Sequence, residues 1–283
     1  MNIPHVGPSA ARVLTRQFDP AVPHPARIYA YWLGGKDHFP GDRKVADEVA
    51  ACRPQVVAGA RANRAFLARA VRYLAGQCRI QQFVDVGPGL PAPGNTHDVA
   101  QAIAPESEIV YLDNDRLVLA HARALMTSRP EGVCEVIDAD LHDPETIMKE
   151  AARTLDFTQP AAIILAAVLH FLHDADDPAG IVATLASFVS QGSFVIISHL
   201  TGDFAPGQVG AGVAAYNAMV PVGLTARTHR EVTALFGGLP LVPPGVVPVS
   251  EWRPDHGPVQ GVSTDMYAGL ASTRQPGNRK IIP

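Results

Sequence analysis

A glycine-rich turn follows the first long apolar run of the chain. Residues 82–86 predict a buried strand, which contains Asp85 and runs into Gly87 and Gly89. Glycines let the backbone approach a ligand without a β-carbon in the way, and open α/β sheets bind ligands at the carboxyl ends of their strands. We therefore expect Asp85, Gly87 and Gly89 to contact a bound ligand. The alternative is a purely structural turn between a strand and a helix.

An acidic residue ends the second predicted strand. The run 108–112 is followed by Asp113 and Asn114. A carboxylate at this place can accept hydrogen bonds from both hydroxyls of a ribose, and it would repel a 2′-phosphate. Asp113, with Asn114 beside it, is therefore the predicted ribose contact. A second use, in which Asp113 or Asp115 caps the next helix, is compatible with ribose binding.

The turn after residues 82–86 lacks the pattern of a pyrophosphate site. A dinucleotide fingerprint continues from G-x-G-x-x-G directly into a helix, whereas here residues 90–94 precede the predicted cap, Asn95. S-adenosylmethionine carries no phosphate, so a looser loop is sufficient for it. The pattern favours this cofactor, with S-adenosylhomocysteine as the product. Two alternatives stay open: a protein that binds the cofactor without transferring a methyl group, and an NAD-dependent oxidoreductase.

Two further strand ends complete the predicted site. Asp140 and Leu141 follow the third strand, where an adenine ring would lie, and Asp140 could accept from the exocyclic amine or serve only as a cap. Ala167, after the fourth strand, would leave room for the sulfonium. His170 is the candidate catalytic residue, because an imidazole titrates near neutral pH and can orient or deprotonate an acceptor. A histidine that only packs against the core or the cofactor is the alternative.

Other chemistries have weaker support in the sequence. His170, His173, Asp174 and Asp176 resemble a group of metal ligands, but capping explains the carboxylates, and no ligand from another segment is evident. We therefore predict no metal site. The 3 cysteines include no C-x-x-C pair, which indicates reduced thiols, and no G-x-S-x-G elbow anchors a hydrolase triad.

The order of the predicted elements explains how these residues would meet. From residue 81 onward, apolar runs alternate with helical patterns, which indicates right-handed βαβ units and a doubly wound parallel sheet. Asp143-Pro144, Asp177-Pro178 and the pair Thr228 and Glu231 are typical helix starts. Strands are expected at 82–86, 108–112, 134–138, 162–167, 193–198 and near 265–272.

Three regions divide the chain. Residues 1–26 are rich in proline and predict a surface arm without chemistry, residues 27–78 a helical cover, and residues 79–283 the cofactor-binding domain. A net charge of -4 without a basic run predicts no nucleic-acid partner. No signal peptide or membrane-length apolar segment is visible, so we expect a cytoplasmic protein. The pattern assigns no oligomeric state.

The segment 27–39 has an unusual mixture of aromatic, glycine and charged residues. Its sequence, RIYAYWLGGKDHF, resembles the R-x-Y-D-Y-x-L-G-G-K-D-N-F opening of a bacterial family that was once a domain of unknown function and is now named S-adenosyl methyltransferase. Ala30 and His38 depart from that opening, where the family has Asp and Asn. Further matches lie at 61–67, 85–91, 111–115, 139–141 and 249–254.

The resemblance implies a fold and a reaction. The fold would be a Rossmann-like, mostly parallel seven-stranded sheet of the class I methyltransferase type with an N-terminal helical cover. The reaction would be methyl transfer from S-adenosylmethionine to an acceptor, which we expect to be a small molecule. In the cover, Tyr31, Gly34 and Lys36 could close the methionine end of the site, with Lys36 or Arg64 pairing with the cofactor carboxylate. The alternative is that this segment is only a packing element.

Overall fold

The computed structural model describes residues 19–255 and 264–273, which form one seven-stranded sheet with helices on both faces. The strand order is β3-β2-β1-β4-β5-β7-β6. Strands β1 to β5 are parallel, β7 runs antiparallel to β5, and the short β6 pairs antiparallel with β7. The predicted doubly wound sheet is confirmed. The strands are β1 (Gln82–Val86), β2 (Glu108–Asp113), β3 (Val133–Asp138), β4 (Ala161–Ala166), β5 (Phe194–Leu200), β6 (Val247–Pro248) and β7 (Met266–Ser272).

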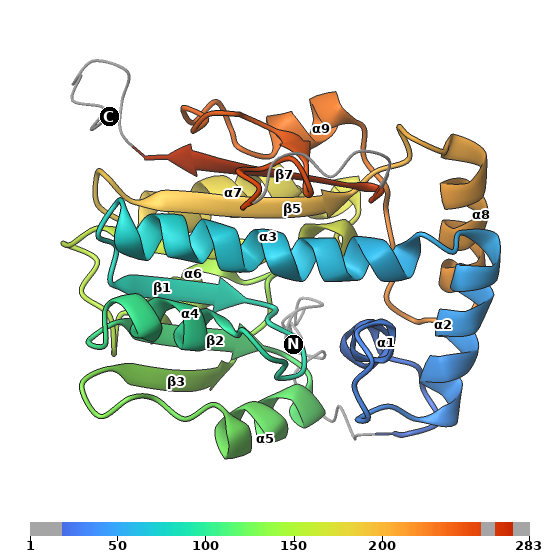
Figure 1. Ribbon diagram of the computed structural model, residues 1–283, viewed down its shortest axis with the longest axis horizontal. Coiled ribbons are helices and arrows are strands. Elements are labelled where there is room, and N and C mark those ends of the chain that lie inside the picture. The colour runs from blue at the N-terminus through green and yellow to red at the C-terminus, as the bar shows by residue number, and fades with distance from the viewer. Residues whose placement is uncertain (1–18, 256–263, 274–283) are drawn as a thin grey trace, which may run out of the picture.

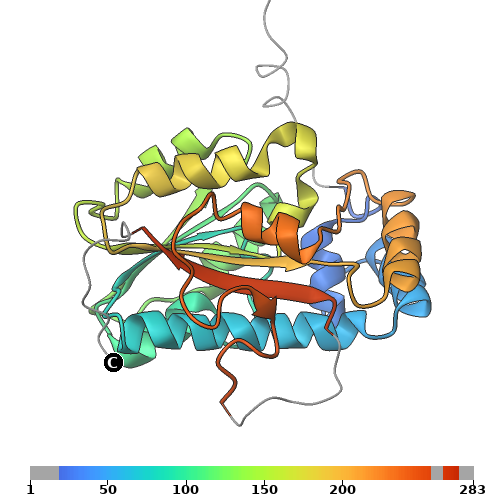
Figure 2. The ribbon, with the colours of Figure 1, turned by 90° about the horizontal axis from the view of Figure 1, so that it is seen from above.

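Two layers of helices cover the sheet, as Figures 1 and 2 show. One layer holds α3 (Val56–Gly76), α4 (Thr96–Ile103) and α5 (Arg116–Leu125). The other holds α6 (Pro144–Ala151), α7 (Pro178–Ser187) and α9 (His229–Ala234). The predicted caps form: Asp143 accepts from Thr146, Asp177 accepts from Gly180, and Thr228 and Glu231 make a capping box.

The alternation of side chains along β1 explains why both faces are buried. Phe83 packs on one side with Phe66 of α3, while Val84 and Val86 pack on the other side with Ile147 of α6. Successive residues of a strand point to opposite faces, so a central parallel strand with helices on both sides is apolar throughout. Gln82 and Asp85 are the polar exceptions in this strand, and Asp85, near its carboxyl end, is only 4% exposed.

The N-terminal helices lie at the carboxyl end of the sheet. Helices α1 (Pro25–Trp32) and α2 (Pro40–Cys52) pack with α8 (Pro206–Asn217) beside the strand ends in Figure 1. Their apolar side chains form a third core cluster around Ile28, Val49 and Tyr216. A buried ion pair, from Nε of Arg27 to Oδ1 of Asp42 at 3.3 Å, joins α1 to α2.

Small differences from the predicted elements occur at their ends. Helix α1 begins at Pro25, within the segment predicted as a surface arm; residues 1–18 of that arm lie outside the described residues. Strand β4 ends at Ala166, because Ala167 takes a left-handed conformation with φ 56° and turns the chain. In the described part of the chain, no helix is both long and apolar enough to cross a membrane.

Candidate functional site

A cavity of about 650 Å³ opens at the carboxyl edge of the sheet. The ends of β1, β2, β3, β4 and β5 and the start of β7 form its floor, and α1, α3 and α8 contribute to its walls. Its size is within the range of small-molecule sites. Ten of the residues predicted for a site line it: Arg64, Asp85, Gly87, Gly89, Asp113, Asn114, Asp140, Leu141, Ala167 and His170.

The turn after β1 bends sharply at two glycines. Gly87 and Gly89 have φ values of 70° and 69°, a region that side chains other than glycine rarely adopt. A β-carbon on Gly87 would lie 2.6 Å from Cγ2 of Val168, so glycine is required where this turn meets the segment after β4. A β-carbon on Gly89 would meet nothing within 4 Å and would stand at the cavity wall.

The carboxylate of Asp113 lies against this turn. It accepts hydrogen bonds from the backbone N–H groups of Gly89, Asn114 and Asp115, the last at 2.9 Å. Burial nevertheless raises the pKa of Asp113 to about 6. Asp115, not Asp113, caps α5, accepting from Leu117 and Val118. Asp113 is therefore available to a ligand while its neighbour performs the capping.

A second buried carboxylate belongs to Asp85. Its Oδ2 accepts a hydrogen bond of 2.6 Å from the hydroxyl of Thr96 at the start of α4. Burial raises the pKa of Asp85 to about 6, although the Thr96 hydrogen bond and the charge of Arg64 act in the opposite direction. Arg64 itself donates to the carbonyl of Gly94 at 3.2 Å and to Oδ1 of Asn95 at 3.4 Å. The site thus holds a carboxylate and a guanidinium close together at one end.

The end of β3 supplies a third carboxylate. Oδ2 of Asp140 accepts from the side-chain amide of Asn114 at 3.2 Å, and Oδ1 accepts from the backbone N–H of His142 at 3.0 Å. Burial alone would raise the pKa of Asp140, but the hydrogen bonds from His142 and Asn114 outweigh it and hold the pKa below its ordinary value. Leu141 lies next to Asp140 on the cavity wall and adds an apolar surface.

His170 lies in η1 (Leu169–Phe171), the first of two 3₁₀ turns that follow β4. The ring lines the cavity and the residue is 7% exposed. Nδ1 of His170 accepts a hydrogen bond of 3.4 Å from the backbone N–H of Leu200. Burial lowers the pKa of His170 well below its ordinary value, and the neighbouring His199 and Arg227 lower it further. The imidazole is therefore neutral.

Three predicted contacts do not line the cavity. Tyr31 donates from its hydroxyl to Oδ1 of Asp47 at 3.1 Å, and Gly34 and Lys36 are exposed. The helical period explains the difference. The side of α1 that turns toward the cavity carries Ile28, Tyr29 and Trp32, so Tyr31 falls on the other side and the glycine turn lies beyond the helix end. The structure therefore places Tyr31, Gly34 and Lys36 outside the lining of this cavity.

Residues of the presumed surface arm line the cavity instead. They include Asp19, Val22 and His24. Nε2 of His24 lies 3.3 Å from Oδ2 of Asp115, so the start of α1 contacts the segment after β2. A signal was present in the sequence: His24 directly precedes Pro25, which is the pattern of a helix cap followed by proline at the first helical position.

Unpaired polar atoms mark the cavity wall. Asn63, Tyr216 and Thr264 line the cavity, and each has a buried side-chain oxygen with no hydrogen-bond partner among the described residues. Buried polar groups in folded proteins are nearly always hydrogen-bonded. These three oxygens are shielded from the cavity as well as from bulk solvent, so the groups that the cavity offers to a ligand are the carboxylates and the glycine turn.

The part of the cavity next to α1, α2 and α8 is largely apolar. Its Arg53 forms an ion pair with Asp265 at 2.6 Å, so neither charge is left for a ligand. The apolar and aromatic side chains that line this part include those of Ile28, Trp32, Val49, Val56, Phe171, Val209, Val213, Tyr216, Val222 and Leu224. Across residues 19–255 and 264–273, no group of three or more histidines, cysteines or carboxylates is placed to hold a metal ion.

Comparison with known proteins identifies relatives of this architecture. The profile of a family described as S-adenosyl methyltransferase matches residues 11–274. A protein of the DUF574 family from Streptomyces avermitilis has 40% identity and a TM-score of 0.85, covering 89% of this chain and 97% of its own. A candidate methyltransferase from Thermobifida fusca has 37% identity and a TM-score of 0.83, covering 90% of this chain and 96% of its own.

More distant structures share the fold alone. An O-methyltransferase family protein from Burkholderia thailandensis has 14% identity and a TM-score of 0.52, and the alignment covers 96% of this chain and 68% of that one. A search of curated proteins found no match. The class I arrangement of the sheet, with its antiparallel β7, agrees with this likeness.

Proposed function

The chain belongs to the S-adenosyl methyltransferase family, and from this premise we propose that it binds S-adenosylmethionine in the cavity and methylates a small molecule. The observation that carries the proposal is the convergence of Asp85, the turn at Gly87 and Gly89, and Asp113 on one cavity. A β-carbon on Gly89 would meet nothing within 4 Å, so no protein atom fills the space in front of this part of the turn.

The carboxyl ends of β2 and β3 suit the nucleoside. Asp113 is already oriented by three backbone N–H groups and would accept from the ribose hydroxyls. Asp140, oriented by Asn114 and His142, would accept from the exocyclic amine of adenine. Leu141 beside it offers an apolar contact to the ring.

The opposite charges around β1 suit an amino-acid tail. Asp85 would pair with the ammonium group, and Arg64 with the carboxylate. Among the described residues, the side chain of Arg64 donates hydrogen bonds to two neutral oxygens, at 3.2 and 3.4 Å, so a carboxylate would be its stronger partner. Lys36, the other residue considered for that carboxylate, is exposed and outside the cavity wall.

Catalysis by this chain would come from positioning and from exclusion of water. When bound, S-adenosylmethionine supplies an electrophilic methyl group on a sulfonium. Ala167 and His170, which follow β4, line the cavity near Gly87, because Val168 between them contacts that glycine. Holding two reactants in a fixed orientation can supply much of the rate enhancement of a transfer reaction.

The apolar part of the cavity supports a small, largely uncharged acceptor. Trp32, Phe171 and Tyr216 provide flat aromatic surfaces, and the ion pair between Arg53 and Asp265 neutralises the charge there. Aromatic and aliphatic linings with few polar groups are typical of small-molecule sites. A macromolecular acceptor would need an exposed surface that leads to the reacting atoms.

Calorimetry and product analysis test this function. We expect the protein to bind S-adenosylhomocysteine and not NAD, and to convert S-adenosylmethionine to S-adenosylhomocysteine with at least one member of a panel of phenols, amines and heterocycles. Binding of NAD without binding of S-adenosylhomocysteine would overturn the cofactor assignment. Tight binding without turnover across the panel would instead assign a cofactor-binding role without catalysis.

A further inference from the structure

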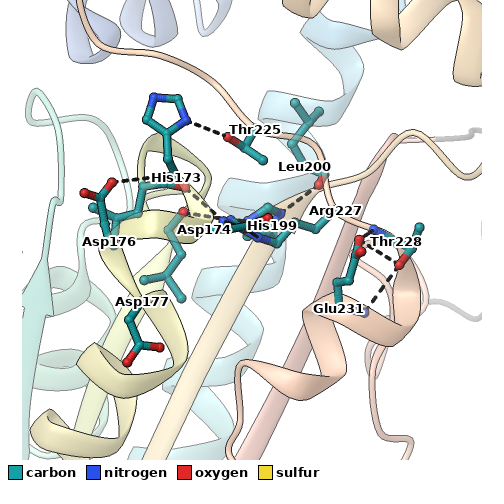
Figure 3. Close-up of polar contacts among 12 residues, drawn as sticks. His173, Asp174, Asp176, Asp177, His199, Leu200, Thr225, Arg227, Thr228 and Glu231 are labelled. Atoms are coloured by element: carbon teal, nitrogen blue, oxygen red, sulfur yellow. Dashed lines mark hydrogen bonds and ion pairs between the residues drawn. The ribbon is translucent and has the colours of Figure 1, made fainter.

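A buried arginine lies behind the cavity wall and contacts both flanks of the turn that carries His170. Arg227 is 5% exposed. Its Nη1 donates to the carbonyl of Leu169 at 3.2 Å, and its Nη2 donates to the carbonyl of Leu172 at 3.0 Å. These carbonyls stand before and after His170, so the guanidinium fixes the backbone on both sides of the ring. Its Nη2 also reaches Oδ1 of Asp174 at 2.7 Å (Figure 3).

The same guanidinium determines the protonation of His199. Nη1 of Arg227 lies 2.9 Å from Nε2 of His199, and since arginine only donates hydrogen bonds, Nε2 must be the bare nitrogen. Nδ1 of His199 lies 2.7 Å from the carbonyl of Leu200, which only accepts, so Nδ1 carries the proton. His199 is therefore neutral and in one tautomer; its surroundings are drawn in Figure 3.

The backbone of Leu200 connects His199 to His170 through hydrogen bonds. Its carbonyl accepts from Nδ1–H of His199 and, at 3.1 Å, from the backbone N–H of Arg227. Its own N–H points to Nδ1 of His170 at 3.4 Å, so that nitrogen is an acceptor. A neutral imidazole with a bare Nδ1 carries its proton on Nε2. The rings of His170 and His199 also touch edge to face, with centroids 5.5 Å apart.

The other ring nitrogen of His170, Nε2, is accessible from the cavity. Nε2 has no hydrogen-bond partner among the described residues, and it is not one of the buried polar atoms sealed from solvent. Because the ring lines the cavity and is otherwise enclosed, Nε2–H is the polar group that it presents there. To act as a general base, His170 would need an unprotonated Nε2, and its proton would then lie on Nδ1. There it would face the backbone N–H of Leu200, so two donors would oppose each other and no hydrogen bond could form.

We propose that Arg227 and His199 are positioning residues that hold His170 as a neutral Nε2–H donor, which binds a lone pair on an oxygen or nitrogen of the acceptor molecule. His170 would thus select acceptors that carry a carbonyl, ether, carboxylate or ring nitrogen near the transfer point, and it would not remove their proton. The role of His170 in binding an acceptor rests on the proposed function, whereas the assignment of its tautomer does not depend on that function.

Nitrogen NMR of the full-length protein tests the proposal without any acceptor. In protein labelled with ¹⁵N-histidine, long-range ¹H–¹⁵N correlations separate the two neutral tautomers and the cation, and the variants His170→Gln and His199→Gln assign the two rings. We expect His170 as the Nε2–H form and His199 as the Nδ1–H form at neutral pH. A His170 that is protonated on Nδ1, or is cationic at neutral pH, would overturn the proposal.

A pair of arginine variants tests the role of Arg227. In Arg227→Gln we expect His199 to lose its single-tautomer pattern and the Nδ1 signal of His170 to shift, while Arg230→Gln, an exposed arginine of α9, leaves both rings unchanged. A folded Arg227→Gln protein with wild-type His170 and His199 signals would contradict the positioning role. If Arg227→Gln does not fold, the wild-type spectrum still decides the tautomer. Failure of S-adenosylhomocysteine to bind would remove the proposed function and leave the tautomer result intact.

Discussion

The backbone N–H of Gly89 donates a hydrogen bond to the carboxylate of Asp113, which joins the turn after β1 to the end of β2. The two segments are also joined by a bond of 2.8 Å from the N–H of Gly87 to the carbonyl of Leu112. The turn at Gly87 and Gly89 and the carboxylate of Asp113 therefore form one hydrogen-bonded unit. Asp113 and Gly89 each contribute one half of that unit.

Loss of the Asp113 carboxylate should weaken cofactor binding. We expect Asp113→Ala to reduce the affinity for S-adenosylhomocysteine by about 1–3 kcal/mol, because charge-assisted hydrogen bonds to the ribose would be lost. Isothermal titration calorimetry measures this. Asp138→Ala is the matched control, since Asp138 pairs with Asp113 in the β2–β3 register, yet it is exposed and does not line the cavity. Equal affinities for the two variants would remove the ribose assignment.

Substitution of Gly89 should reduce binding more than stability. Gly89 and Gly94 share positive φ values of 69° and 77°, and a β-carbon on either would meet nothing within 4 Å. Alanine at either position should cost about 1–2 kcal/mol of folding free energy from backbone strain. Only Gly89 lines the cavity, so only Gly89→Ala should also weaken binding of S-adenosylhomocysteine. Thermal melts and calorimetry on both variants separate the two effects, and parallel losses of affinity would show that strain alone is responsible.

The charge partner of the amino-acid tail is testable with a truncated ligand. Arg64→Gln should weaken binding of S-adenosylhomocysteine, because the carboxylate would lose its guanidinium, whereas Lys36→Gln should leave it unchanged. Methylthioadenosine lacks the amino-acid tail, so Arg64→Gln should bind it with wild-type affinity. A loss of affinity for both ligands would mean that Arg64 acts through its contacts to Gly94 and Asn95, as a structural residue.

Much of the sheet and of its carboxyl edge could be predicted from the sequence, because the period of a strand and the residue types of a turn are local features. The predicted strand 82–86 coincides with β1, and the bend at Gly87 and Gly89 follows it. The same rule predicts that Asp113 and Asp140 lie together, since parallel strands place their carboxyl ends at one edge of the sheet. These residues all line the same cavity.

The N-terminal helices and the apolar side of the cavity could not be predicted in the same way. Which side of α1 faces the cavity depends on its packing against α2 and α3, so the choice between Tyr31 and Tyr29 required the tertiary structure. The contacts of Arg227 join segments more than 50 residues apart in the chain. No local pattern marks such an arginine, and its role follows only from the carbonyls around it.

The raised pKa of Asp85 predicts how cofactor binding depends on pH. In the unliganded protein, burial raises the pKa of this carboxyl to about 6, and an ammonium group would bind only the ionised form. Affinity for S-adenosylhomocysteine should therefore be constant above about pH 7 and fall as the pH drops through 6. In Asp85→Asn the affinity should be low throughout, and the remaining pH dependence should come from Asp113, whose pKa is also about 6.

The raised pKa of Asp85 affects the stability of the unliganded protein in the opposite direction to cofactor affinity, because stability falls with rising pH while affinity rises. Because the folded state holds the Asp85 proton more tightly than the unfolded state does, ionisation is unfavourable to folding, and stability falls as the pH rises through about 6. The difference from the ordinary value of 3.8 corresponds to about 3 kcal/mol at pH 8. Asp85→Asn should thus raise the free energy of unfolding at pH 8, measured by urea denaturation, although it abolishes tight binding. A variant that loses stability as well as affinity would show that the Asp85 to Thr96 hydrogen bond outweighs the cost of the buried charge.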